Sequence, residues 1–185
     1  MFSLRNAIVF TMILALISVP DLASANGNVV VILLDDSGSM NDKMKSDRKS
    51  EPRMVVAKRA LLKLVEQLPE ESTQLGVLLL NGSKNTGGWL VPLGRLNREE
   101  TIKRINIVLP NGGTPLGSSL KTAMEALIEH RRKQPAGDYR LLVVTDGEAT
   151  DKNLLQAYLP DIVSRGIFVD VIGVDMATDH SLAKR

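Results

Sequence analysis

The chain has 185 residues, of which 44% are hydrophobic and 24% are charged, and it contains no cysteine. This size and balance fit one globular domain, and they exclude a chain that is disordered throughout, disulfides, thiolate metal sites and cysteine nucleophiles. A formal net charge of +2 and an aromatic content of 3% argue against nucleic-acid binding, which relies on basic patches and stacking platforms.

The N-terminal segment 1–25 has the pattern of a secretory signal. Arg5 precedes an apolar run from Ala7 to Val19, and a small-residue A-x-A pattern ends at Ala25. The alternative is an uncleaved anchor, but the run is shorter than the ~20 residues that a membrane-spanning helix needs. We therefore expect cleavage after Ala25 and a secreted or periplasmic domain, residues 26–185, without a membrane span.

Apolar runs of strand length alternate with amphipathic segments along the rest of the chain. Continuous apolar runs are typical of strands buried on both faces, and they predict strands at Val29–Leu34, Leu75–Leu80, Arg140–Thr145 and Ile167–Ile172, with a short strand Trp89–Val91 that Pro92 confines to an edge. Apolar residues at helical spacing predict helices at Met54–Leu68, Arg98–Val108, Pro115–Arg132 and Leu154–Ser164. This alternation predicts an α/β sandwich around a parallel sheet.

Oxygen-bearing side chains follow the strands of this predicted sheet. Asp35, Ser37 and Ser39 follow the first strand, Asp146 follows the strand that ends at residue 145, and Thr114 lies at the start of a helix. Because the carboxyl ends of parallel strands meet at one edge, we expect these groups to converge there. Carboxylate and hydroxyl oxygens select Mg²⁺, Mn²⁺ or Ca²⁺, and the small ligand set favours Mg²⁺ or Mn²⁺.

Charge suggests how such an ion would work. Only Asp35 and Asp146 would neutralise it, since the other groups are neutral hydroxyls. The ion then stays electron-poor and keeps a coordination position filled only by water. An Asp or Glu side chain of a partner can displace that water, so the metal would bridge this domain to an acidic protein.

These residues also carry a family resemblance, which covers about residues 28–184. The segments DxSxS, GGTPLG and TDG resemble, in order and rough spacing, the metal-ion-dependent adhesion site of von Willebrand factor type A domains, most of all bacterial secreted members. The resemblance implies a Rossmann-like three-layer fold, with a mostly parallel sheet and one short antiparallel edge strand. It also implies a non-enzymatic protein-binding module, often used in adhesion or assembly, with metal contacts from Asp35, Ser37, Ser39, Thr114 and Asp146.

Two features depart from the family pattern. The chain stops soon after the strand Ile167–Ile172, whereas the family continues with a helix, a last strand and a closing helix. We therefore expect either an incomplete domain or a bare sheet edge that pairs with another chain. The second feature is the charged stretch Asn41–Arg53 beside the proposed site, for which a solvated loop is favoured over a surface that recruits an acidic partner.

Simpler interpretations of the site residues stand beside the metal hypothesis. The Asp35 segment can be an ordinary Asp/Ser turn, and Thr114 can be the N-cap of the following helix, which is compatible with metal binding. We expect Asp36 to point away from the site, because only Asp35 keeps the D-x-S-x-S spacing. Glu148 can support the metal ligands from outside or be a surface acid, and the surface acid is favoured.

Catalytic motifs are incomplete. A phosphatase of the haloacid dehalogenase type needs Asp where Ser37 stands, and a phosphate-binding loop needs Lys where Ser118 stands. His130 and His180 lie away from the predicted strand ends, and no G-x-S-x-G elbow is present. The alternatives to a binding module are a structural or assembly subunit with a vestigial metal site and, less favoured, a metal-dependent hydrolase.

Overall fold

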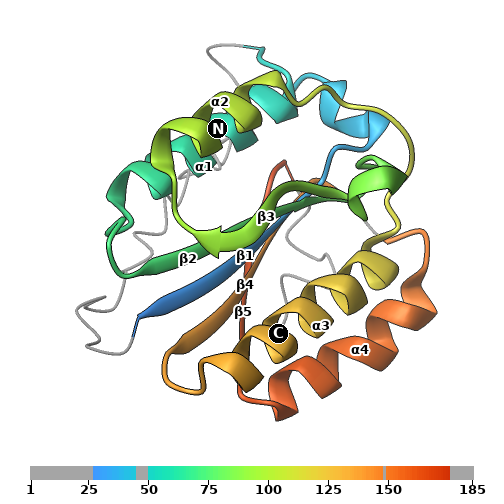
Figure 1. Cartoon of the computed structure of the whole chain (residues 1–185). Coiled ribbons are helices and arrows are strands. Elements are labelled where there is room, and N and C mark those ends of the chain that lie inside the picture. The colour runs from blue at the N-terminus through green and yellow to red at the C-terminus, as the bar shows by residue number, and fades with distance from the viewer. Residues whose placement is uncertain (1–26, 45–49, 148, 176–185) are drawn as a thin grey trace, which may run out of the picture.

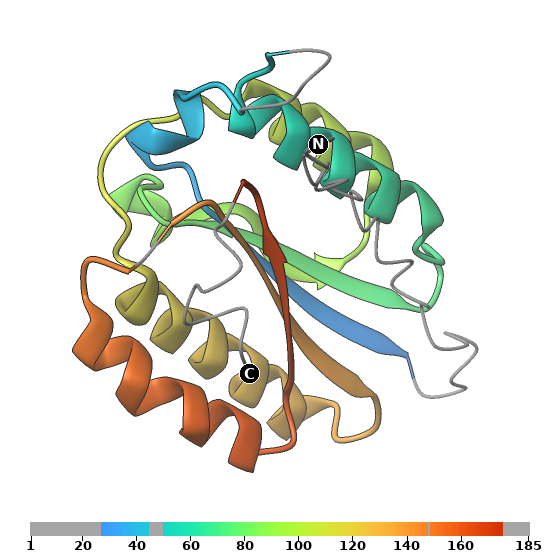
Figure 2. The same ribbon diagram turned by 180° about the vertical axis from the view of Figure 1, so that it is seen from behind.

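The computed structural model describes residues 27–44, 50–147 and 149–175, which form three layers (Figure 1). A five-stranded sheet lies between one helix pair, α1 and α2, and another, α3 and α4 (Figures 1 and 2). The strands are β1 (Asn28–Leu34), β2 (Thr73–Leu79), β3 (Trp89–Arg95), β4 (Asp138–Thr145) and β5 (Phe168–Gly173). The helices are α1 (Arg53–Gln67), α2 (Arg98–Ile107), α3 (Leu116–Lys133) and α4 (Lys152–Ser164), with short 3₁₀ turns η1 (Gly38–Asn41) and η2 (Lys84–Thr86). This architecture confirms the predicted α/β class.

The order of the strands places a crevice beside β1. The order is β3-β2-β1-β4-β5, with β3 antiparallel and the other strands parallel. Leu34 at the end of β1 pairs with Leu79 of β2 on one side and with Val144 of β4 on the other. The chain leaves β1 toward β2 but leaves β4 toward β5, so the carboxyl ends of β1 and β4 form the topological switch point where such sheets bind ligands.

Two apolar cores hold the layers together. Alternate residues of β1 point to opposite faces of the sheet. Val30, Ile32 and Leu34 join the core that includes α1 and α2, whereas Val29, Val31 and Leu33 join the core that includes α3 and α4. β1 is therefore buried on both faces, and the polar loop that begins at residue 35 follows directly from this central strand.

The edge strand β3 is longer than the sequence predicts, since it continues past Pro92 to Arg95. Its register with β2 is irregular between the pairs Val77–Val91 and Leu75–Gly94, which flank Pro92. A bulge on an edge strand tolerates the missing N–H of proline, so Pro92 does not end the strand.

Several sequence predictions lie outside the described residues. They are the secretory signal 1–25, residues 45–49 of the charged stretch, Glu148, and the end of the chain from residue 176, which includes His180. Within the part of the chain that is described, no helix is long and apolar enough to cross a membrane.

Candidate metal site

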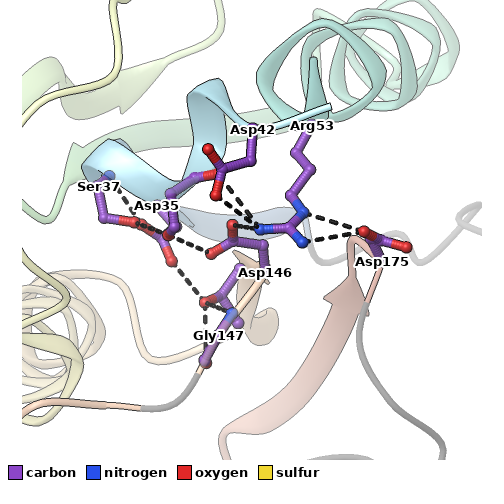
Figure 3. Close-up of polar contacts among 9 residues, drawn as sticks. Asp35, Ser37, Asp42, Arg53, Asp146, Gly147 and Asp175 are labelled. Carbon is purple, nitrogen blue, oxygen red and sulfur yellow. Dashed lines mark hydrogen bonds and ion pairs between the residues drawn. The ribbon is translucent and has the colours of Figure 1, made fainter. Parts of the chain in front are cut away.

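The loop that follows β1 begins with a buried aspartate that is held from two sides (Figure 3). Asp35 Oδ1 accepts a hydrogen bond of 2.9 Å from the backbone N–H of Ser37, and Oδ2 accepts one of 2.6 Å from the hydroxyl of Thr145 at the end of β4. The backbone N–H of Asp35 also donates to Val144 O at 2.8 Å, which continues the β1–β4 ladder. The side chain of Asp35 is therefore fixed by its own loop and by the neighbouring strand.

A chain of hydroxyl contacts joins this loop to the aspartate that follows β4. Ser37 Oγ and Ser39 Oγ are 3.0 Å apart, and Ser39 Oγ donates to Asp146 Oδ1 at 3.0 Å. The Asp146 side chain is only 1% exposed. Burial raises the pKa of Asp146, and the nearby carboxylate of Asp35 adds to the shift. Four of the five predicted site residues thus lie together at the switch point.

The fifth residue, Thr114, comes from the loop between α2 and α3. Two backbone hydrogen bonds tie this loop to the one after β1: Gly38 N–H donates to Gly112 O at 3.0 Å, and Asn111 N–H donates to Asp36 O at 2.6 Å. Thr114 is 8% exposed, and its hydroxyl makes no side-chain hydrogen bond to any described residue. A hydroxyl that no described side chain engages is available to act as a metal ligand.

The helix-capping interpretation of Thr114 is wrong. The residue at the N-cap of α3 is Pro115, which has no side chain able to accept a hydrogen bond. The free backbone amides of Gly117 and Ser118 instead donate to the two carboxylate oxygens of Asp151, both at 2.8 Å. Asp151 fills the capping role from the start of α4, and sequence reasoning missed it because the contact joins two distant segments.

The neighbouring acid, Asp36, belongs to a different network. Its Oδ1 accepts hydrogen bonds from the backbone N–H and the side-chain amide of Asn81, at 2.8 Å and 3.1 Å. The same amide donates to Gly113 O at 2.8 Å, so Asp36 and Asn81 brace the loop that carries Thr114. Burial raises the pKa of Asp36. The expectation that Asp36 has no part in the oxygen cluster agrees with these contacts.

Sequence reasoning missed a cation at the site, Arg53, the first residue of α1. Its Nη1 donates to Asp146 Oδ2 at 3.0 Å and to Ser39 O at 3.3 Å (Figure 3). Its Nε and Nη2 donate to Asp175 Oδ2 at 3.2 Å and 3.0 Å, and Asp42 lies 3.7 Å from Nη1. The interpretation of the charged stretch as a solvated loop is therefore wrong for Arg53.

The donor set of this cluster fits a hard divalent cation. The five side chains offer only carboxylate and hydroxyl oxygens, the ligands that Mg²⁺ and Mn²⁺ prefer. Among the described residues, no group of three or more His, Cys, Asp or Glu side chains offers another metal site. An ordinary Asp/Ser turn explains the bond from Ser37 N–H to Asp35, but not the contact from Ser39 to Asp146, 107 residues away.

Residues 30–184 match the family model of the von Willebrand factor type A domain. The match spans most of the chain, so the chain belongs to this family. The sheet order and the cluster of oxygen side chains at the carboxyl ends of β1 and β4 agree with that membership.

Solved structures show the same fold at low sequence identity. The manganese-loaded TRAP protein of Plasmodium vivax superposes with a TM-score of 0.64 at 17% identity, over 86% of this chain and 62% of that one. A von Willebrand factor type A protein from Catenulispora acidiphila gives 0.59 at 24% identity, over 80% of this chain and 33% of that one. The PTMP1 protein of the mussel byssus, solved with a zinc-occupied MIDAS motif, gives 0.59 at 23% identity, over 80% of this chain and 38% of that one.

These solved proteins are longer than the region they share with this chain, which spans less than two thirds of each of the three. At such identities the likeness shows the fold alone. None of the curated proteins matches the chain closely enough to count as a relative.

Proposed function

We propose that this domain binds a protein partner through a divalent cation held directly or through water by Asp35, Ser37, Ser39, Thr114 and Asp146. The observation that carries the proposal is the meeting of two carboxylates and two hydroxyls from separate loops, linked by contacts of about 3 Å. The manganese and zinc in two solved members of the family support a divalent ion in general. The oxygen donors favour Mg²⁺ or Mn²⁺, with Ca²⁺ as a further candidate.

The charge of the site favours an acidic partner. Two carboxylates from this chain would balance the charge of the ion, and the hydroxyls would add none. Ser39 is exposed, so solvent and a partner can reach the cluster. The ion would keep a water ligand that an Asp or Glu side chain can replace, because the neutralised site would carry no excess negative charge to repel that side chain. The role is binding and not catalysis.

The place of action follows from the sequence of residues 1–25. Its signal-like pattern supports export, so we propose a secreted or periplasmic domain, similar to bacterial secreted members of the family and active in adhesion or assembly.

The metal is tested first, by titrating the purified protein with Mn²⁺ in a calorimeter. We expect one ion per chain, and no measurable binding by Asp35→Ala. Asp161→Ala removes a partly exposed aspartate on α4 whose side chain pairs only with Arg165 among the described residues, and it should bind as the unaltered protein does. Equal binding by Asp35→Ala and the unaltered protein would contradict the proposed site.

A second candidate function is docking through the sheet edge, with a vestigial metal site. It rests on β5, which has one neighbouring strand in the described part of the sheet and exposes Phe168 by 53% and Val171 by 38%. Chelation separates the two functions. Partner binding that EDTA abolishes supports the metal bridge, whereas binding that survives EDTA supports edge pairing.

A further inference from the structure

The guanidinium of Arg53 connects three segments that are far apart in the sequence. It contacts Ser39 in η1, Asp146 after β4, and Asp175, two residues beyond the end of β5 (Figure 3). We infer that Arg53 is a resident counter-charge that lowers the affinity of the site for divalent cations, and that Asp175 sets the strength of this effect. The inference rests on the proposed metal site and goes beyond its ligands.

The two carboxylate oxygens of Asp146 accept hydrogen bonds from different partners. Oδ1 accepts from Ser39, inside the oxygen cluster, while Oδ2 accepts from Arg53 at 3.0 Å. A metal ion that contacts the cluster through Oδ1, directly or through water, therefore shares this carboxylate with the guanidinium. Arg53 need not leave for the ion to enter, so its charge acts on the ion continuously.

Burial explains why a resident cation is needed. Asp35 and Asp146 are both almost fully buried and repel one another, which is unfavourable unless an opposite charge is close. Among the described residues, Arg53 is the cation that forms an ion pair with Asp146. It thereby holds the cluster together without metal. When a divalent ion binds, the same charge repels it and leaves the loaded site less negative, which favours an anionic partner.

Asp175 controls how much of this charge the site receives. It binds Arg53 through Nε and Nη2, at 3.2 Å and 3.0 Å, and its backbone lies in the left-handed region with φ of 57°. A carboxylate on the far side of the guanidinium offsets part of the positive charge that faces Asp146. Asp175 is thus a positioning residue that acts on the metal mainly through Arg53. The position of the chain just beyond β5 is thereby coupled to the metal site.

The test is a double-mutant cycle on Mn²⁺ affinity, measured by calorimetry on the purified protein. Arg53→Met should bind Mn²⁺ at least about tenfold more tightly, because a like charge is removed from the ion's surroundings. Asp175→Asn should bind about threefold more weakly, because the charge of Arg53 is no longer balanced. In the Arg53→Met background, Asp175→Asn should have a clearly smaller effect, because only the direct attraction between Asp175 and the ion is then lost.

Arg53→Lys is the matched control. It keeps the positive charge but loses the fork that contacts both carboxylates, so its Mn²⁺ affinity should stay close to that of the unaltered protein. Thermal unfolding in EDTA gives a second readout. Arg53→Met should unfold at a lower temperature than the unaltered protein, and Mn²⁺ should raise its midpoint by the larger amount. If Arg53→Met does not fold, Arg53→Gln takes its place in every arm.

The outcomes separate this inference from the proposed function. If the unaltered protein binds Mn²⁺ and Arg53→Met binds it equally or more weakly, the inference is wrong and the metal site stands. An effect of Asp175→Asn that is as large without Arg53 as with it also overturns the inference. If Arg53→Met binds Mn²⁺ and the unaltered protein does not, the inference about Arg53 is supported, but the metal bridge proposed for the unaltered protein is contradicted. No binding by any of these variants would overturn both.

Discussion

The two carboxylates of the candidate site are held in different ways. Asp35 is fixed by groups next to it in the fold: the N–H of Ser37 in its own loop and the hydroxyl of Thr145 on the paired strand. Asp146 is fixed by the hydroxyl of Ser39 and by a side chain from another layer, Arg53 of α1, which also binds Asp175. Contacts at the ends of β1 and β4 thus position Asp35, whereas a long-range ion pair helps to position Asp146.

This difference separates what is rigid from what can be adjusted. The contacts of Asp35 depend on the β1–β4 register, which the two apolar cores on either side of the sheet stabilise. The contact of Asp146 with Arg53 is partly exposed and is shared with a residue beyond the last described strand. We therefore expect changes around Asp35 to abolish or weaken the site, and changes around Asp146 to tune it.

The largest effect is expected from alanine at the two carboxylates. Asp35→Ala should lower Mn²⁺ affinity at least a hundredfold and also destabilise the metal-free protein by about 1–3 kcal/mol, because it leaves the Ser37 N–H without its partner and removes the shortest hydrogen bond of the buried Thr145 hydroxyl. Asp146→Ala should also lose Mn²⁺ but should destabilise less, because it removes a repelling buried charge. Urea unfolding in EDTA measures the difference. Equal destabilisation by the two variants would contradict the comparison.

A smaller effect is expected from Thr145→Val, which keeps the shape of the side chain but removes the hydrogen bond to Asp35 and two longer ones with the backbone of Gly147. Supporting contacts to metal ligands typically contribute tenfold or more to affinity, so we expect about a tenfold loss of Mn²⁺ affinity. Thr122→Val is the control, since that hydroxyl bonds only to Ser118 O on α3 among the described residues. A tenfold loss in the control as well would show that the assay reports global stability and not the site.

Substitutions in the loop that carries Thr114 test whether this fifth residue contributes to Mn²⁺ affinity. Gly112 has φ of +80°, and a Cβ there would lie 2.4 Å from Asn81 Oδ1, so Gly112→Ala should cost about 1–3 kcal/mol and shift the loop. We expect a few-fold loss of Mn²⁺ affinity from the displaced Thr114. Gly113→Ala meets no atom within 4 Å and is the matched control. If both variants bind Mn²⁺ like the unaltered protein, Thr114 does not contribute.

The smallest effect is expected from Asp36→Asn. The side-chain oxygen of asparagine can still accept the two hydrogen bonds from Asn81, so the loop should keep its structure. Mn²⁺ affinity should change by less than about threefold, because only a more distant charge is lost. A loss as large as that of Asp35→Ala would place Asp36 among the ligands.

Most of the fold could be predicted because its signal is local. Continuous apolar runs predict the strands, and β1 begins and ends within one residue of its predicted bounds. The prediction that the strand at Ile167–Ile172 is buried on both faces is wrong, because β5 has one neighbouring strand in the described sheet and is partly exposed. The length of β3 could not be predicted, because whether Pro92 ends a strand depends on a bulge against β2. The capping of α3 could not be predicted either, because the residue that accepts from its first amides, Asp151, lies at the start of α4.

The same distinction applies to the site. The oxygen side chains follow directly after strands, so the strand pattern alone brings Asp35 and Asp146 to one edge. The sequence indicates Thr145 only as the last residue of a strand, and its hydrogen bond to Asp35 follows from the order of the strands. Arg53 and Asp175 carry no motif, and they meet only because α1 and β5 pack beside β4.

The most direct test of the central claim is the water-proton relaxation of the Mn²⁺-loaded protein. A bound ion with an open position relaxes bulk water strongly, and a peptide with a single Asp should reduce this effect by replacing the water. An uncharged peptide with Asn in place of that Asp should leave it unchanged. We expect strong relaxation that falls only with the acidic peptide. Weak relaxation from the start, or equal effects of the two peptides, would contradict a metal bridge to an acidic partner.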